Sequence, residues 1–249
     1  MPYLKAQGVS LVFPLYSAST KPTLSGNANV VTDKTGKMTG VRCLQNIDID
    51  LRSGDRLAVI GGNGAGKTSL LQVLAGIYPP DVGYVEVSGS CTNLININLG
   101  MRPEATGYEN ILLRGLAAGH SRLEIEEQRQ QIAAFSELGE FLDMPVRTYS
   151  AGMRMRLNFA IATAFKPEIL LLDEWLSAGD ASFRARAAER MGSFVGEAGI
   201  LVLASHSVSL LKKNCNKAIW LDQGTIKASG DVETIWDAYI ADKVKSKAG

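Results

Sequence analysis

The chain has 249 residues, of which 46% are hydrophobic and 20% charged, and its 26 basic and 25 acidic side chains give a formal net charge of +1. These proportions are those of an ordinary globular protein, and a chain of this size can bury a sizeable core. The balanced charge gives no support to a broad nucleic-acid-binding surface, so we expect no nucleic-acid partner.

The sequence shows neither the pattern of a secretion signal nor a membrane-spanning apolar run. Its N-terminus lacks the basic start and apolar middle of a secretion signal. No apolar run approaches the roughly 18–20 residues needed to span a bilayer, so any work at a membrane requires another chain to supply the membrane part. The three cysteines are odd in number and widely spaced, which favours free thiols in a reducing compartment.

The N-terminal third of the chain alternates apolar runs with turn-forming segments. Residues 17–42 are rich in Ser, Thr, Gly, Asn and Lys, which indicates a loop or hairpin insertion. Leu57–Ile60 is suited to a buried central strand, and the helical spacing of Thr68–Ala75 stops at Gly76. The other strands predicted in this part are Ala6–Phe13, Ile47–Leu51 and Gly83–Val87.

The rest of the chain contains a long helical block and further strands. Residues Tyr108–Tyr149 have helical spacing and many charges, whereas Ile169–Leu172 and Ile200–Ala204 are apolar strand candidates. Ala218–Leu221 and Thr225–Ala228 predict a closing hairpin. Strands and helices that alternate on both sides of a helical block favour an α/β fold with a parallel core and a helical subdomain.

A glycine-rich segment matches the phosphate-binding pattern GxxxxGK[ST] without a gap. An apolar strand precedes it and a helix follows it, and this context favours a phosphate loop over a plain glycine-rich turn. Glycines let backbone amides converge on phosphate oxygens, and the helix N-terminus adds partial positive charge. We expect Lys67 to reach the β- and γ-phosphates of a nucleotide and the Thr68 hydroxyl to bind Mg²⁺. The predicted nucleotide contacts are Gly61, Gly62, Asn63, Gly64, Ala65, Gly66, Lys67, Thr68 and Ser69.

Two carboxylates end the apolar strand Ile169–Leu172. Ligands bind at the carboxyl ends of strands in open α/β sheets, so the pair has a functional position. We expect Asp173 to bind Mg²⁺ and Glu174 to act as general base for an attacking water. His206 follows the strand Ile200–Ala204 at the corresponding end, from where it could bond a phosphate or the water.

The segment Tyr149-Ser150-Ala151-Gly152-Met153 precedes the acidic pair and heads a second helix. It resembles, in variant form, the LSGGQ signature of the ATP-binding-cassette (ABC) ATPases. The resemblance implies one ABC nucleotide-binding domain over residues 1–249, with a mostly parallel central sheet, an N-terminal antiparallel β region and a helical subdomain at about 100–160. It also implies that Ser150 and Gly152 grip the ATP held by a second copy of the chain, in a head-to-tail dimer.

The same resemblance covers other positions. Ser177-Ala178-Gly179-Asp180 resembles the loop that contacts the partner across the dimer, and His206 matches the switch histidine. Phe13 resembles the aromatic residue on which adenine stacks; Tyr16 is an alternative, and either could be a core residue. A glutamine that this family carries after the Gly83–Val87 strand is missing here, which leaves Asn98 as a weak candidate for its metal contact.

The stretches LGMRPEATGYENI, YSAGM and DEWLSAGD resemble exporters of bacterial cell-surface polysaccharides such as O-antigen, capsule and teichoic acid. This resemblance implies an ATPase that uses ATP and Mg²⁺ and powers export of a lipid-linked polysaccharide. It implies an integral membrane permease as partner and a peripheral position on the cytoplasmic side of the bacterial inner membrane. The alternatives are a soluble ABC ATPase of translation or DNA repair, and a nucleotide-binding regulator that does not hydrolyse.

Overall fold

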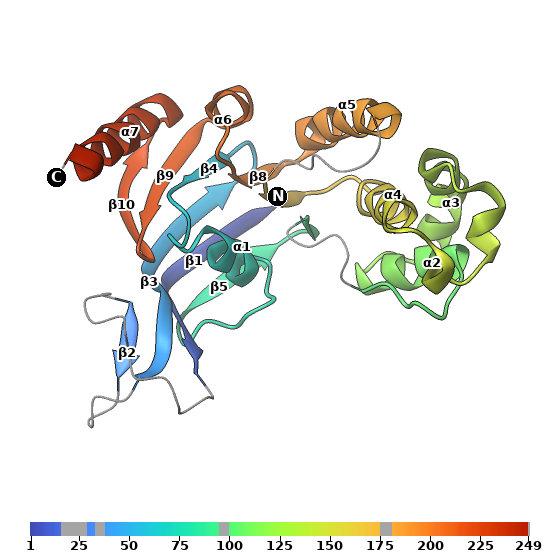
Figure 1. The fold of residues 1–249 in the computed structure, drawn as a ribbon, viewed down its shortest axis with the longest axis horizontal. Coiled ribbons are helices and arrows are strands. Elements are labelled where there is room, and N and C mark those ends of the chain that lie inside the picture. The colour runs from blue at the N-terminus through green and yellow to red at the C-terminus, as the bar shows by residue number, and fades with distance from the viewer. Residues whose placement is uncertain (16–28, 33–37, 95–99, 175–180, 249) are drawn as a thin grey trace. The chain divides into compact units, whose positions relative to one another are not determined.

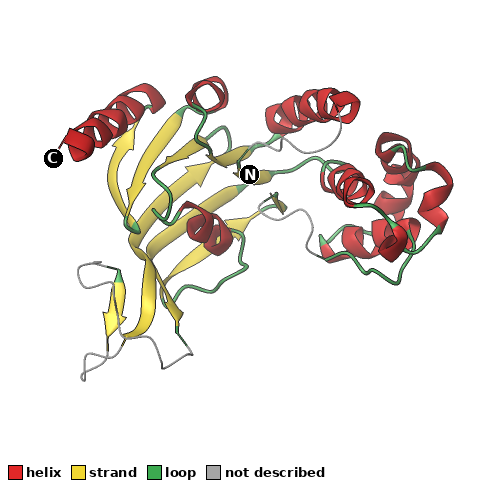
Figure 2. Ribbon diagram, viewed as in Figure 1, coloured by secondary structure: helices red, strands yellow, loops and turns green. Residues whose placement is uncertain are grey.

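The computed structural model describes residues 1–15, 29–32, 38–94, 100–174 and 181–248. The chain divides into two compact units, which we describe separately. Figure 2 shows that the first is built mainly from strands and the second from helices. The first unit comprises Met1–Cys91, Glu168–Glu174 and Gly199–Gly249, and the second comprises Thr92–Pro167 and Trp175–Ala198.

A six-stranded sheet forms the centre of the first unit (Figure 1). The strands are β4 (Arg56–Ile60), β6 (Cys91–Asn93), β7 (Ile169–Asp173), β8 (Ile200–Ala204), β9 (Lys217–Asp222) and β10 (Thr225–Gly230). Their order is β10-β9-β4-β8-β7-β6, and the pairs β4–β8, β4–β9 and β7–β8 are parallel. The apolar runs predicted as central strands are almost completely buried, as expected for strands covered on both faces.

A second, antiparallel sheet completes the strand layers of this unit. Its order is β2-β3-β1-β5, with β1 (Tyr3–Pro14), β2 (Val30–Thr32), β3 (Met38–Arg52) and β5 (Val82–Ser88). The fold is therefore α/β, with a mixed sheet of mostly parallel strands and an antiparallel sheet, as predicted.

Strand β3 begins at Met38, well before the predicted start at Ile47, so the predicted start of this strand was wrong. The described part of residues 17–42 forms β2 and the start of β3, which pair antiparallel through Val30 and Val41. Residues Met38–Gln45 have no period-2 apolar pattern, and pairing with β1 and β2 on either side holds them extended. Tertiary pairing thus overrides the local sequence preference.

Three helices belong to this unit, among the residues that the structure describes. Helix α1 (Lys67–Leu74) follows β4 after the glycine-rich loop 61–66, and α6 (Val208–Asn214) follows β8. Helix α7 (Val232–Ala248) packs on β9 and β10, and Trp220 of β9 contacts Tyr239 of α7 edge-on at 5.9 Å between ring centroids.

The second unit contains the helices α2 (Gly107–Ala117), α3 (Arg122–Ser136), α4 (Ala151–Ala162) and α5 (Ala181–Glu197), with 3₁₀ turns at Gly139–Asp143 and Val146–Thr148. Thr106 and Ser121 begin α2 and α3 with reciprocal capping boxes to Glu109 and Glu124. Helix α5 belongs to this unit although it lies beyond the predicted 100–160 range.

Apolar residues from α2, α3 and α4 form the core of the second unit, with Ile111, Ile125 and Ile132 at its centre. Within the described residues, no helix combines the length and apolar character that crossing a lipid bilayer requires.

Candidate nucleotide site

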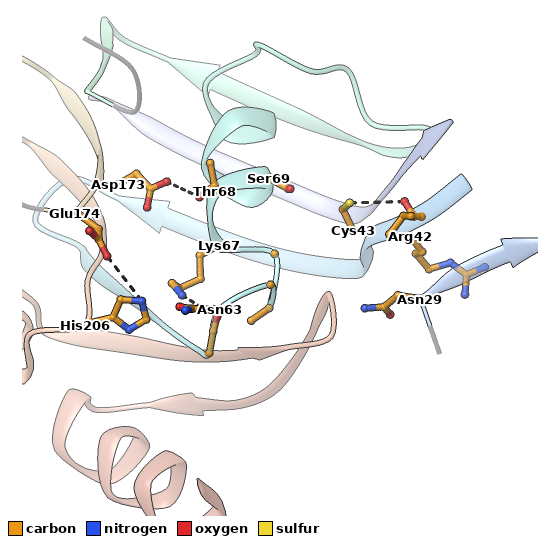
Figure 3. A pocket seen from close by; sticks show the side chains of 15 residues that line it. Asn29, Arg42, Cys43, Asn63, Lys67, Thr68, Ser69, Asp173, Glu174 and His206 are labelled. Atoms are coloured by element: carbon orange, nitrogen blue, oxygen red, sulfur yellow. Dashed lines mark hydrogen bonds and ion pairs between the residues drawn. The ribbon is translucent and has the colours of Figure 1, made fainter. Parts of the chain in front are cut away.

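A cavity lies at the carboxyl ends of the parallel strands of the first unit (Figure 3). Its volume is about 530 Å³, which is within the range of small-molecule and cofactor sites. Strands β4, β7 and β8 run parallel, so the residues that follow them meet at one edge of the sheet. The cavity is lined by Asn29, Val41, Arg42, Cys43, residues 62–69, Asp173, Glu174 and His206.

The phosphate loop provides a cradle of the kind that an anion requires. Gly64 and Gly66 have φ angles of +75° and +104°, a region that residues with a β-carbon avoid. A β-carbon on Gly62 or Gly64 would meet nothing within 4 Å, so the loop is open on the side where these residues line the cavity. Gly66 begins α1 and has no side chain to cap the first-turn amides, which can therefore donate to phosphate oxygens.

Lys67 lies in the middle of this cradle. Its side chain is 9% exposed, and its ammonium donates to the carbonyls of Gly61 and Gly62 at 2.9 Å each. Burial lowers the pKa of Lys67, and the carboxylates of Asp173 and Glu174 oppose that shift. The loop thus holds one cation close to the amides, so both attract the negative charge of a phosphate.

The Thr68 hydroxyl and the Asp173 carboxylate meet at one point of the cavity. Thr68 Oγ1 donates to Asp173 Oδ2 at 2.5 Å, a contact between α1 and the end of β7. Hydroxyl and carboxylate oxygens are ligands that Mg²⁺ accepts, together with substrate phosphates and water. The pair fits a site for this ion beside the phosphate cradle.

Glu174 and His206 face each other across the same cavity. Glu174 Oε1 lies 3.7 Å from His206 Nε2, and both side chains are substantially exposed, at 63% and 47%. The Glu174 backbone has a φ of +65°, a conformation that costs roughly 1–2 kcal/mol for a residue with a β-carbon. Its amide donates to the Ala204 carbonyl at 2.8 Å, so β8 helps to hold this unfavourable turn. The strain turns the residue after Asp173 toward the cavity, which suits a catalytic carboxylate.

One residue just before β2 and three residues of β3 also line the cavity, and our sequence interpretation missed them. These residues are Asn29, Val41, Arg42 and Cys43. Val41 of β3 pairs with Phe13 of β1, and no pattern in the sequence indicated this pairing between distant segments. The Phe13 ring packs edge-on against Tyr78 at 5.1 Å and does not line the described cavity, so its adenine contact stays a prediction.

The two signature residues lie in the second unit, at the start of α4. Ser150 is the N-cap, and its hydroxyl oxygen accepts from the Met153 amide at 3.2 Å. Because that oxygen acts as acceptor, its hydrogen remains able to donate to an anion. The space around Gly152 is open, with only the Ser150 hydroxyl within 4 Å of a β-carbon placed there. Tyr16, Asn98 and Asp180 lie outside the described residues, and their predicted roles stay predictions.

Comparison with solved structures shows the same fold. A dimeric ATP-binding cassette in a post-hydrolysis state bound to ADP and Pi aligns with a TM-score of 0.66 at 16% identity, covering 92% of this chain and 98% of that chain. The ATP-binding subunit of an ABC transporter aligns with a TM-score of 0.67 at 20% identity, covering 95% and 92%. The architecture is that of an ATP-binding cassette.

The sequence comparisons place the chain in a family. The ABC transporter family model matches residues 44–177. The O-antigen export system ATP-binding protein RfbE of Yersinia enterocolitica is 42% identical over 225 residues, which cover 88% of this chain and 94% of that protein. This chain therefore belongs to the ABC transporter family.

Two further relatives are longer than this chain. The O-antigen export system ATP-binding protein RfbB of Myxococcus xanthus is 38% identical, covering 80% of this chain and 46% of its own length. The teichoic acids export ATP-binding protein TagH of Bacillus anthracis is 39% identical, covering 79% of this chain and 36% of its own length. The chain thus spans less than half of these two relatives.

Cys43 offers a direct probe of the cavity. Burial raises the pKa of its thiol, and a hydrogen bond with Ser69 of the phosphate loop opposes that shift. Burial raises the pKa of Cys91 to about 11 and that of Cys215 to about 12. The thiolate is the form that reacts, so we expect alkylation of Cys43 to be slow at pH 7.5 and to quicken by about tenfold per pH unit up to its pKa.

We predict that saturating ATP with Mg²⁺ protects Cys43 from alkylation at pH 8.5, because the nucleotide would fill the cavity that Cys43 lines. Mass spectrometry of modified peptides measures the rate at each cysteine, with Cys215 as the internal control that ATP does not affect. Equal labelling of Cys43 with and without ATP would contradict this placement of the nucleotide.

Proposed function

We propose that this chain is the ATP-hydrolysing subunit of an ABC exporter that moves a lipid-linked cell-surface polysaccharide of the O-antigen type. The observation that carries the proposal is one cavity in which the phosphate loop, the Thr68–Asp173 pair, Glu174 and His206 come together. The cargo class is supported by the names of the relatives, which export O-antigen and teichoic acids.

Within this proposal, the first unit binds ATP through its triphosphate. The α1 amides and the Lys67 ammonium would hold the β- and γ-phosphates, and Thr68 and Asp173 would hold Mg²⁺. The ion would supply positive charge beside the phosphate oxygens. Phe13 or Tyr16 supplies the stacking surface for adenine.

Glu174 and His206 act on the attacking water. The Glu174 carboxylate accepts a proton from it as general base, and His206 donates toward the γ-phosphate or orients the water. Both side chains are exposed to the cavity and lie 3.7 Å apart, so a small movement of either brings them into hydrogen-bond contact. Water can reach them because neither is sealed by the rest of the first unit.

A second copy completes the site. Ser150 and Gly152 at the α4 N-terminus of that copy donate to the γ-phosphate, and Asp180 contacts the first copy across the interface. ATP thereby favours a head-to-tail pair, and hydrolysis removes the γ-phosphate that both copies share. Affinity of the closed pair for ATP over ADP converts hydrolysis into movement.

An integral membrane permease receives that movement, and the chain works on the cytoplasmic face of the inner membrane as a peripheral subunit. The exposed apolar side chains Leu113, Leu116 and Leu123 of the second unit support a protein contact there.

We predict that the chain purified from membranes brings down one polytopic membrane protein. Ribosomes or DNA in its place, with no membrane protein, would contradict the export assignment.

Glu174→Gln tests the catalytic assignment. The substitution keeps the size of the side chain but removes its ability to accept a proton, so we expect ATP affinity to be retained and turnover to fall by about 10²-fold or more. We also expect ATP to drive this variant into stable dimers, measured by size-exclusion chromatography with light scattering.

Glu86→Gln on the exposed strand β5 serves as the matched control and should hydrolyse ATP at the wild-type rate. Undiminished hydrolysis by the Glu174→Gln protein would remove Glu174 from the role of general base.

A further inference from the structure

Helix α3 ends at a residue that is unfavourable for its backbone conformation. Glu137 is the C-cap of α3 and has a φ of +53°, in the left-handed region where glycine is strongly preferred. A glycine here would form the same turn without the steric cost of a β-carbon. A side chain kept at such a position points to a function for that side chain.

The Glu137 carboxylate contacts two arginines on two other helices. Its Oε2 lies 3.2 Å from Arg156 Nη1 on α4 and 2.6 Å from Arg186 Nη2 on α5. Both guanidinium groups also stand over the ring of the buried Phe183, at 5.2 Å and 5.8 Å from its centroid. One carboxylate therefore joins the end of α3 to α4 and to α5, all within the second unit.

Helices α4 and α5 each follow a segment that the proposed dimer depends on. Ser150 is the N-cap of α4, and only residues 175–180 separate Glu174 in sequence from the start of α5. A cavity of about 300 Å³ lies beside the signature residues, and Glu137 and Arg156 line it together with Ser150 and Gly152. The ion-pair cluster therefore borders the surface that would meet the γ-phosphate of the second copy.

We propose that Glu137 is a positioning residue, which fixes the α4 N-terminus against α5 so that Ser150 and Gly152 can seal the nucleotide of the second copy. The inference rests on the proposed function, because it assumes that the signature residues act across a dimer. Without the carboxylate, the two arginines repel each other, and α4 loses the charged part of its contact with α5, while the ring contact between Phe159 and Phe183 remains.

The exposure of the cluster argues against a mainly stabilising role. The side chains of Glu137, Arg156 and Arg186 are 45%, 21% and 37% exposed, although the Arg186 Nη2 atom itself is buried, and ion pairs between partly exposed side chains contribute little to folding stability. The unfavourable φ of Glu137 further reduces what it adds to stability. Replacing Glu137 with glycine should therefore lower turnover without lowering the melting temperature.

Glu137→Gly separates the two roles. We expect a melting temperature equal to or above that of the wild type, because the backbone strain is removed. We expect unchanged ATP affinity of the monomer, whose phosphate loop lies in the other unit, and turnover at saturating ATP reduced by about tenfold or more. Turnover within about twofold of the wild type would overturn the proposal.

Glu137→Gln removes the charge and keeps the side chain, and it should likewise lower turnover without changing monomer affinity. Glu126→Gln is the matched control, since it breaks an ordinary pair with Arg129 on the same helix and should leave turnover unchanged. In a double-mutant cycle, Glu137→Gln should cost little further turnover once Arg186→Gln is present. Fully additive losses would show that Glu137 does not act through Arg186.

The outcomes also separate this inference from the proposed function. The proposed function fails if the wild-type protein does not hydrolyse ATP and the Glu174→Gln variant does not form dimers with ATP. If the wild type hydrolyses ATP, the Glu174→Gln variant dimerises, and the Glu137 variants hydrolyse ATP at the wild-type rate, the positioning role alone fails.

Discussion

The structure depends on how closely the phosphate loop is packed against the strands beneath it. A β-carbon on Gly61 would collide with the Leu221 carbonyl of β9, and one on Gly66 would lie 2.6 Å from the Cys43 carbonyl of β3. The turn after β9 is bonded to the loop as well, through the Gly224 amide and the Ala65 carbonyl at 3.0 Å. Glycines at these positions let the backbone approach so closely, and that approach directs the amides of the loop and of α1 outward to the cavity.

Charge is arranged around that backbone scaffold. Lys67 is nearly buried, yet Asp173 and Glu174 lie close enough to offset part of the cost of burying its charge. The same two carboxylates lie at the end of β7, where Asp173 is bonded to Thr68 and Glu174 is turned toward His206 by its left-handed backbone. Parallel strands thus bring a cation, a hydroxyl–carboxylate pair and a second carboxylate to one edge of the sheet.

Much of this site could be predicted because its signals are local. The loop 61–68, the acidic end of β7 and His206 each follow an apolar run, and strand ends are where such a sheet collects its ligands. The lining residues on β3 could not be predicted, because only pairing with β1 and β2 brings Val41, Arg42 and Cys43 to the cavity. Helix α7 was also missed, since it follows the final hairpin and its burial against β9 is a tertiary effect. Glu137 was invisible for a different reason: nothing in its neighbouring residues reveals a left-handed backbone or two arginines from distant helices.

The central claim is that the triphosphate of ATP binds in the loop that Lys67 completes. The most direct test is the equilibrium affinity for ATP with Mg²⁺, measured by isothermal titration calorimetry on the wild type and on Lys67→Ala. Removing the ammonium takes away a charge-assisted contact to the phosphates, so we predict an affinity lower by about tenfold or more in a variant that remains folded. Equal affinity of the two folded proteins would contradict the account.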